Sequence, residues 1–238
     1  MFEQARRDVE TADRHVQAVL RRDQFEELRP ALAAAYDRGV YVQVALFVPS
    51  EEAEPDPGDV TGVCTELRRL TFPRPFLVLT DRRRVSFSPK GRSAEEYGVI
   101  VDGRTTPFVF HWFFLVACWE VYEPIHEDSR ESLPFTLVEI TDAVRHLEGL
   151  VRDDATVHVR IEGTSVLTGR PRTLSGTVVG VDYVGRTGEG GAVPPLHQLA
   201  ARATIVLETD EGTFTVGGDG ATVEDVSAER IVLERIER

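Results

Sequence analysis

The chain has 238 residues, and 40 acidic against 27 basic side chains give it a formal net charge of −13 at pH 7. With 42% hydrophobic and 28% charged residues, its composition is that of a folded globular protein, which excludes a wholly disordered or fibrous chain. So negative a chain repels phosphate, which excludes nonspecific binding to nucleic acid. We therefore expect no direct contact of this chain with DNA.

No apolar run approaches the ~18 residues that span a bilayer, and the first residues lack the apolar core of a signal peptide. The sequence therefore predicts a cytoplasmic protein without membrane contact. The two cysteines, Cys64 and Cys118, have no paired CxxC spacing, so we interpret them as small buried hydrophobic residues rather than a disulfide framework or a zinc knuckle.

The acidic excess also suggests a host. Lys90 is the only lysine, and Val, Ala and Thr are abundant, a pattern typical of proteins from salt-loving organisms. Dense salt would screen the self-repulsion of a halophilic protein, whereas an ordinary acidic protein from a GC-rich mesophile is the alternative. A melting curve in molar KCl against dilute buffer separates these two hypotheses.

The predicted elements begin with a β-α-β unit. Residues 2–12 have apolar side chains every three or four positions, which predicts a helix. Residues 15–20 alternate as in a strand, a capping box opens a helix over residues 23–39, and residues 40–48 form an apolar, β-branched run. The natural interpretation is two parallel strands joined by a helix.

The rest of the first half predicts a loop, several strands and a buried helix. Residues 49–62 are rich in acids and prolines and predict a solvated loop. The short apolar runs that follow predict strands at residues 64–70, 76–79, 85–87 and 97–101. Residues 105–122 are apolar on most sides, which predicts a largely buried helix. We place the end of the first domain at residue 124.

The second half predicts a different architecture. After a charged connector at residues 125–132, a domain over residues 133–238 begins with one helix that carries Leu137, Ile140, Val144 and Leu147. Short strand-like runs divided by glycine turns then continue to the end. Residues 186–198 are glycine-rich and predict a mobile loop or a lid. The predicted fold class is therefore α/β plus β.

Catalysis has little support in the sequence. No phosphate-cradling, metalloprotease or serine-hydrolase motif is present, and the six histidines show no metal-ligand spacing. We therefore predict a protein that is not an enzyme, with no catalytic residue, no metal site and no cofactor.

The sharpest local feature is the stretch Val216–Asp225, in which a strand breaks into glycines and ends with two carboxylates. Glycines allow backbone amides to approach a ligand, and carboxylates accept hydrogen bonds from sugar hydroxyls. The alternative is a glycine turn with an acidic, solvated rim. From the residues alone the turn is the favoured interpretation, because short motifs are weak signals.

Two aromatic residues and one basic run also have two interpretations each. Trp112 and Trp119 are seven residues apart on the predicted helix, where core packing is favoured over stacking on a sugar. Arg82, Arg83 and Arg84 lie between two predicted strands, where a solvated turn is favoured over an anion or partner contact.

Several stretches together resemble the effector-binding part of TrmB-type sugar-sensing transcriptional regulators of archaea. The best marker is the GG-x-x-A-x-x-E-D block within Val216–Asp225, and the order of elements over nearly the whole chain adds to it. The remaining stretches that carry the resemblance are residues 28–44, 97–102 with the Trp-rich helix after it, 133–134 and 163–176.

The resemblance implies a non-catalytic, phospholipase-D-like α/β domain followed by a small β-rich domain that holds a sugar at its boundary. It also implies a homodimer, or a heterodimer with related regulators. The sugar-contacting positions that it transfers to this chain, with Glu224 as hydroxyl acceptor and Gly218 as close-approach backbone, are Gly218, Asp219, Thr222, Val223 and Glu224. Asp219 departs from the bulky apolar residue expected there, so the identity of the sugar stays open.

These regulators begin with a winged helix-turn-helix, and here the sequence starts with the predicted helix at Phe2. We therefore expect an effector-binding region whose sugar binding shifts the orientation of the two domains and thereby controls an attached or partnered DNA-binding domain. The alternative is a standalone interaction protein that dimerises with or sequesters related regulators without a ligand.

Overall fold

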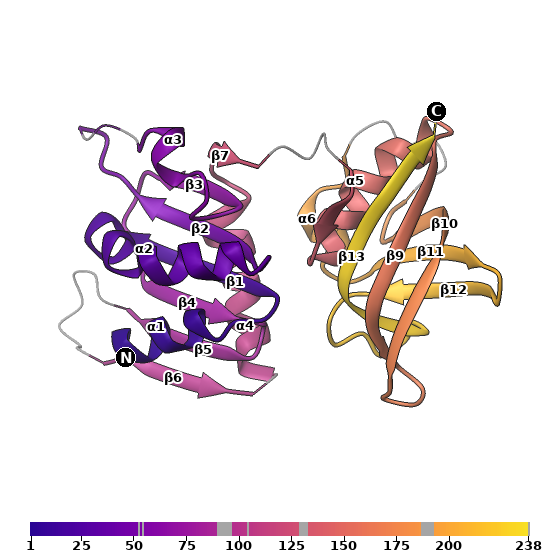
Figure 1. Ribbon diagram of the computed structural model, residues 1–238, viewed down its shortest axis with the longest axis horizontal. Coiled ribbons are helices and arrows are strands. Elements are labelled where there is room, and N and C mark those ends of the chain that lie inside the picture. The colour runs from indigo at the N-terminus through magenta and orange to yellow at the C-terminus, as the bar shows by residue number, and fades with distance from the viewer. Residues whose placement is uncertain are drawn as a thin grey trace. The chain divides into compact units, whose positions relative to one another are not determined.

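The computed structural model describes residues 1–51, 53, 55–89, 97–103, 105–128, 133–186 and 193–237. The chain divides into two compact units, Met1–Asp128 and Ser129–Arg238, which are drawn in Figure 1. The division falls inside the predicted connector, part of which, residues 129–132, lies outside the described residues. Residues 187–192 of the predicted mobile loop or lid lie outside them as well.

The first unit is built on a seven-stranded mixed sheet in the order β6-β5-β4-β1-β2-β3-β7. Strands β1, β2 and β3 are parallel neighbours, and the other four strands pair antiparallel. The strands are β1 (His15–Arg21), β2 (Tyr41–Phe47), β3 (Glu66–Leu70), β4 (Phe76–Thr80), β5 (Arg84–Ser88), β6 (Val99–Asp102) and β7 (Pro124–Glu127). Strand β7 includes three residues of the predicted connector, because Glu127 and His126 pair with β3.

Helices α1 (Phe2–Glu10) and α2 (Arg22–Asp37) pack on one face of this sheet (Figure 1). Every second residue of β1, namely Val16, Ala18 and Leu20, lies in the core beneath them. The predicted β-α-β unit is confirmed, since β1 and β2 pair in parallel on either side of α2. The predicted loop at residues 49–62 contains a short helix, α3 (Pro57–Val60).

On the opposite face lies α4 (Thr105–Phe113), which continues as the π-helix η1 (Phe114–Trp119). The prediction that this helix is largely buried is wrong for one side. Side chains of η1 such as Phe114 and Cys118 are buried, but Phe108, Val109 and Val116 are more than half exposed. The helix therefore covers the sheet with one side and turns a second apolar side outward.

The two tryptophans have different environments. Trp119 is buried, stacks on Phe114 at 5.1 Å between ring centroids, and has the Arg68 guanidinium over its ring at 4.6 Å. Trp112 is half-buried and meets Phe108 edge to face. The wider π-helical turn between them changes the phase of the helix, so a spacing of seven does not place both rings in one environment. Core packing describes Trp119.

A chain of hydrogen-bonded polar side chains is buried between α4 and the sheet. Arg82 Nη2 lies 3.2 Å from His111 Nε2, and His111 Nδ1 lies 2.8 Å from Gln17 Oε1. The Gln17 amide donates to Gln43 Oε1 at 3.0 Å, and His15 Nε2 reaches the same oxygen at 3.0 Å. These contacts join β1, β2 and α4, and they satisfy polar groups whose burial would otherwise be costly.

The direction of this chain fixes His111 in the neutral form, and burial keeps His15 neutral as well. Since the Arg82 guanidinium can only donate, His111 Nε2 accepts, and its proton lies on Nδ1 facing Gln17. Burial, and then the nearby Arg82 charge, lower the pKa of His15 to about 3. The same two causes hold the pKa of His111 well below its usual range. A proton on either ring would add an unmatched charge to the interior.

The second unit is a small closed β-barrel. Its sheet order is β12-β11-β10-β9-β13-β8, and an additional β12–β13 pairing joins the ends of a five-stranded ring. Closure removes exposed strand edges from the ring. The strands are β8 (Phe135–Leu137), β9 (Thr156–Ser165), β10 (Pro171–Tyr183), β11 (Ala203–Thr209), β12 (Gly212–Gly217) and β13 (Val226–Glu237).

Helix α5 (Ile140–Arg152) packs on the barrel, and a short helix α6 (Leu196–Leu199) precedes β11 (Figure 1). The predicted leading helix begins later than expected, because Leu137 lies in β8 and pairs with Ile231 of β13. One apolar side of α5, with Val144 and Leu147 fully buried, completes the barrel core. The predicted fold class, α/β plus β, is confirmed.

The buried histidines predict a loss of stability in mild acid. Their pKa values are lower in the folded chain than in the unfolded chain, so their contribution is complete above about pH 6.5 and is lost as the pH falls below it. Two such groups should cost about 2 kcal/mol of unfolding free energy between pH 7 and 5.5. Urea unfolding followed by tryptophan fluorescence measures this in the first unit, which holds both tryptophans.

Replacing His111 by Gln should roughly halve that loss, because Gln keeps a donor and an acceptor but does not titrate. The exposed His197 provides the control, and His197→Gln should leave the pH dependence unchanged. Equal pH dependence in wild type and His111→Gln would show that His111 is not the buried neutral group described here.

Candidate functional site

The glycine and carboxylate stretch forms the loop that closes the barrel. Strands β12 and β13 are parallel and pair through only two residue pairs, Val216 with Val226 and Gly217 with Ser227. Parallel neighbours usually need a connection of about a dozen residues or more, whereas here residues 218–225 suffice. The loop must therefore fold back tightly beside the strand it has just left.

Two glycines make this return possible. A Cβ atom on Gly217 would lie 2.7 Å from both the Ala221 Cβ and Glu224 Oε2, closer than side chains tolerate. Gly220 has a φ of +87°, in the left-handed region that glycine adopts without cost. Crowding within the chain thus falls on Gly217, next to Gly218, whose backbone is expected to approach a bound sugar.

Two side chains outside the glycines hold the loop in place. Asp225 accepts hydrogen bonds from the backbone N–H and the hydroxyl of Thr215 at 2.8 and 2.7 Å, and both lower the pKa of its carboxyl. The Ser227 hydroxyl donates to the Gly218 carbonyl at 3.1 Å and accepts from the Gly220 N–H at 3.0 Å. Asp225 thus has a structural role at the end of the loop.

Glu224 is positioned by a strand far from it in sequence. The hydroxyl of Thr204, a buried residue of β11, donates to Glu224 Oε1 at 2.9 Å. Glu224 Oε2 lies over Gly217. A carboxylate has about four acceptor sites, so this contact leaves Glu224 able to accept further hydrogen bonds.

The other predicted residues lie on the same loop with less engagement. Asp219 is half-buried, Thr222 is exposed, and Val223 is 86% exposed. Within the part of the chain that the structure describes, the Asp219 carboxylate and the Thr222 hydroxyl have no hydrogen-bond partner. The loop therefore combines two unengaged polar groups, an exposed aliphatic side chain and the anchored Glu224.

The structure adds residues that the sequence analysis missed. Thr204, Thr215 and Ser227 position the loop, and the Val166 N–H donates to the Asp225 carbonyl at 2.9 Å. Val166 belongs to the stretch 163–176 that carries part of the TrmB resemblance, so that stretch and the loop meet in space. The threonines and the serine gave no local signal, because strand register alone brings them to the loop.

Two known families of one kind of regulator match almost the whole chain. The family description "Transcriptional regulator TrmB, EBD N-terminal subdomain" matches residues 1–126, and "TrmB/TrmBL1, EBD C-terminal subdomain" matches residues 132–236. The chain therefore belongs to the TrmB family of transcriptional regulators and comprises both subdomains of their effector-binding domain. A search of curated proteins found no match.

Three solved structures show local similarity. The archaeal chromatin protein TrmBL2, whose structure is described as showing a novel mode of DNA binding, has 20% identity and a TM-score of 0.42 over 51% of this chain and 49% of its own. The phospholipase D family member Nuc from Salmonella typhimurium has 16% identity and a TM-score of 0.37, covering 52% and 90%. NucT from Helicobacter pylori has 13% identity and a TM-score of 0.38, covering 47% and 83%. The chain thus matches about half the length of TrmBL2.

Among the described residues, every helix is too short or too polar to cross a bilayer. The same residues contain no group of three or more His, Cys, Asp or Glu side chains arranged to hold a metal ion.

The tight loop predicts a specific cost for a methyl group at Gly217. Gly217→Ala should lower the unfolding free energy of the second unit by about 1–3 kcal/mol, because the new Cβ overlaps Ala221 and Glu224. Gly180→Ala is the matched control, since a Cβ there meets nothing within 4 Å, and it should change stability by less than about 0.5 kcal/mol. Chemical unfolding followed by circular dichroism measures both variants, and equal effects would contradict the packing described.

Proposed function

We propose that the closing loop of the barrel, residues 218–225, binds a small polyhydroxylated effector, most simply a sugar. Membership in the TrmB effector-binding domain family supports an effector of low molecular weight. The single observation that carries the proposal is Glu224, a carboxylate held by Thr204 at 2.9 Å with acceptor capacity left over.

The remaining groups of the loop suit the same ligand. A sugar presents hydroxyl donors around an apolar C–H surface. Asp219 and Thr222 offer polar groups that are not used within the described residues, and Val223 offers an exposed aliphatic surface. Because Gly217 has no side chain, Glu224 lies directly against the backbone of β12.

Binding there is proposed to control DNA binding by an attached or partnered winged helix-turn-helix domain. A ligand shifts a conformational equilibrium only by its differential affinity for the two states. The closing loop is a suitable place for such a difference, since it makes the short β12–β13 pairing on which barrel closure depends. An effector bound to the loop would stabilise the barrel with its β12–β13 pairing formed.

The test is a thermal-shift and calorimetry screen of the full chain in molar KCl with glucose, maltose, trehalose, sucrose and sugar phosphates. A ligand at 100 times its dissociation constant should stabilise the chain by about 2.7 kcal/mol. Glu224→Gln should then weaken that ligand about 10- to 100-fold, because a hydrogen bond to a charged acceptor contributes about 1.5–3 kcal/mol. The amide can still accept from Thr204, so the loop should keep its shape.

Glu211→Gln is the matched control. Glu211 is an exposed carboxylate in the β11–β12 turn, at the other end of β12, and pairs with Arg172 at 2.7 Å. The Glu211→Gln variant should bind the sugar with the affinity of the wild type. Equal weakening by both variants, or full affinity in Glu224→Gln, would remove Glu224 from the site.

A second candidate function rests on the apolar outer side of α4 and η1, formed by Phe108, Val109 and Val116. Exposed apolar patches often mark protein interfaces. Residues 105–119 contain no Asp, Glu, Lys or Arg, although the chain carries a net charge of −13. Two copies of so acidic a protein repel each other, so an uncharged face is where they can meet. We propose a second copy of this chain as the occupant.

Val109→Lys should weaken a homodimer at least tenfold, because a desolvated ammonium would oppose the apolar contact. Sedimentation equilibrium of the full chain measures the dimer constant. Val179→Lys is the control, since Val179 is 48% exposed on β10 in the other unit. A monomeric wild type, or a dimer that Val109→Lys leaves intact, would contradict this function.

A further inference from the structure

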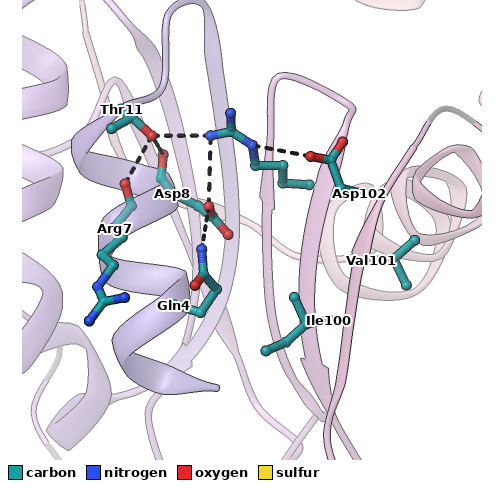
Figure 2. A pocket seen from close by; sticks show the side chains of 8 residues that line it. Gln4, Arg7, Asp8, Thr11, Ile100, Val101 and Asp102 are labelled. Atoms are coloured by element: carbon teal, nitrogen blue, oxygen red, sulfur yellow. Dashed lines mark hydrogen bonds and ion pairs between the residues drawn. The ribbon is translucent and has the colours of Figure 1, made fainter.

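The first unit contains a cavity that neither the loop site nor the apolar face of α4 uses. It lies between α1 and strands β5 and β6, of which β6 forms the edge of the sheet, and its volume is about 310 Å³ (Figure 2). That is near the lower end of the ~300–1,000 Å³ usual for small-molecule sites. Its lining consists of Gln4, Arg7, Asp8, Thr11, Arg84, Ile100, Val101 and Asp102.

A buried carboxylate forms part of the cavity wall. The side chain of Asp8 is only 7% exposed, and its Oδ1 receives the Gln4 amide at 3.0 Å and lies 3.7 Å from the Arg84 guanidinium. Its Oδ2 has no partner among the residues that the structure describes. In Figure 2 this second oxygen points from α1 into the space toward Ile100. A buried anionic acceptor thus faces the cavity with one oxygen unused.

The hydrogen-bond donors around Asp8 are largely engaged by the protein itself. Arg84 Nη1 donates to Thr11 Oγ1 at 3.1 Å, and Arg84 Nε lies 3.8 Å from Asp102. The Thr11 hydroxyl in turn donates to the Arg7 carbonyl at 3.0 Å. The Arg7 guanidinium points away from Ile100 across α1 in Figure 2. An anionic ligand would therefore meet the Asp8 carboxylate without a dedicated cation.

The remaining wall is made of an acceptor and aliphatic surface. Because the Gln4 amide nitrogen donates to Asp8, its oxygen remains as an acceptor. Opposite, Ile100 is 55% exposed and points toward α1 in Figure 2, so its side chain offers aliphatic contact. A matching ligand donates hydrogen bonds at one end and is apolar at the other. The net charge of −13 also attracts cations to the chain.

We propose that this cavity binds a small aliphatic amine in its ammonium form. The ammonium group donates to Asp8 Oδ2 and to the side-chain oxygen of Gln4, Oε1, and the alkyl chain lies against Ile100. The proposal uses first-unit residues alone, so its outcome is independent of the sugar site in the second unit.

The test is a titration of the 15N-labelled full chain with n-butylammonium chloride, followed by amide NMR shifts. Saturable shifts should be confined to α1, β5 and β6. Tetramethylammonium chloride, which has charge but no N–H donor, and glycerol, which has hydroxyls but no charge, should each bind at least tenfold more weakly. Shifts spread over the acidic surface, equal binding of tetramethylammonium, or preferential binding of glycerol would overturn the proposal.

Variants locate the site. Asp8→Asn keeps an acceptor for Gln4 and should weaken butylammonium at least tenfold. Ile100→Trp is the second variant, for use if Asp8→Asn fails to fold. Ile100 is an exposed residue of the edge strand β6, so a tryptophan there should fill the cavity and abolish binding. Glu10→Gln is the matched control, because Glu10 is a 52% exposed carboxylate of the same helix outside the cavity. Unchanged binding in Ile100→Trp, or equal weakening by Glu10→Gln, would contradict the assignment.

Discussion

Closure of the second-unit barrel depends on one short parallel pairing, Val216–Val226 and Gly217–Ser227, made by a loop that folds back on its own strand. That constraint explains why position 217 lacks a side chain, why Gly220 adopts a positive φ, and why Asp225 and Ser227 hold the turn by hydrogen bonds. The same fold-back carries Glu224 over the backbone of β12, where Thr204 holds it. Structural and proposed binding roles therefore coincide in one loop.

The first unit is specified differently, by a buried chain of neutral polar side chains rather than by a tight turn. The hydrogen bonds run from Arg82 through His111 and Gln17 to Gln43, whose side-chain oxygen also accepts from His15. Satisfied buried networks fix one packing of a helix on a sheet, because any other packing leaves polar groups without partners. Here that packing places α4 with its uncharged outer side exposed. The interior network thus determines which apolar residues remain available to a partner.

Much of the fold could be predicted from local pattern, and the site only in part. Alternation and helical spacing were sufficient for β1, α2 and β2, and for the change from α/β to β. The outward side of α4 was missed, because a helix that is apolar all round does not reveal which side meets the sheet. Within the loop, glycines and carboxylates stand together in sequence and were found. Thr204 is joined to Glu224 only by strand register, and the Asp8 cavity only by tertiary packing, so neither had a sequence signal.

Residues 218–225 are proposed to bind a polyhydroxylated effector through Glu224. The measurement that tests this binding is a crystal structure of the full chain grown with the sugar that most strongly stabilises it. In that crystal, a sugar hydroxyl should lie within hydrogen-bonding distance of Glu224 while the Thr204 contact persists. A sugar bound elsewhere in the chain, with the loop unoccupied and unchanged, would show that the loop is not the binding site.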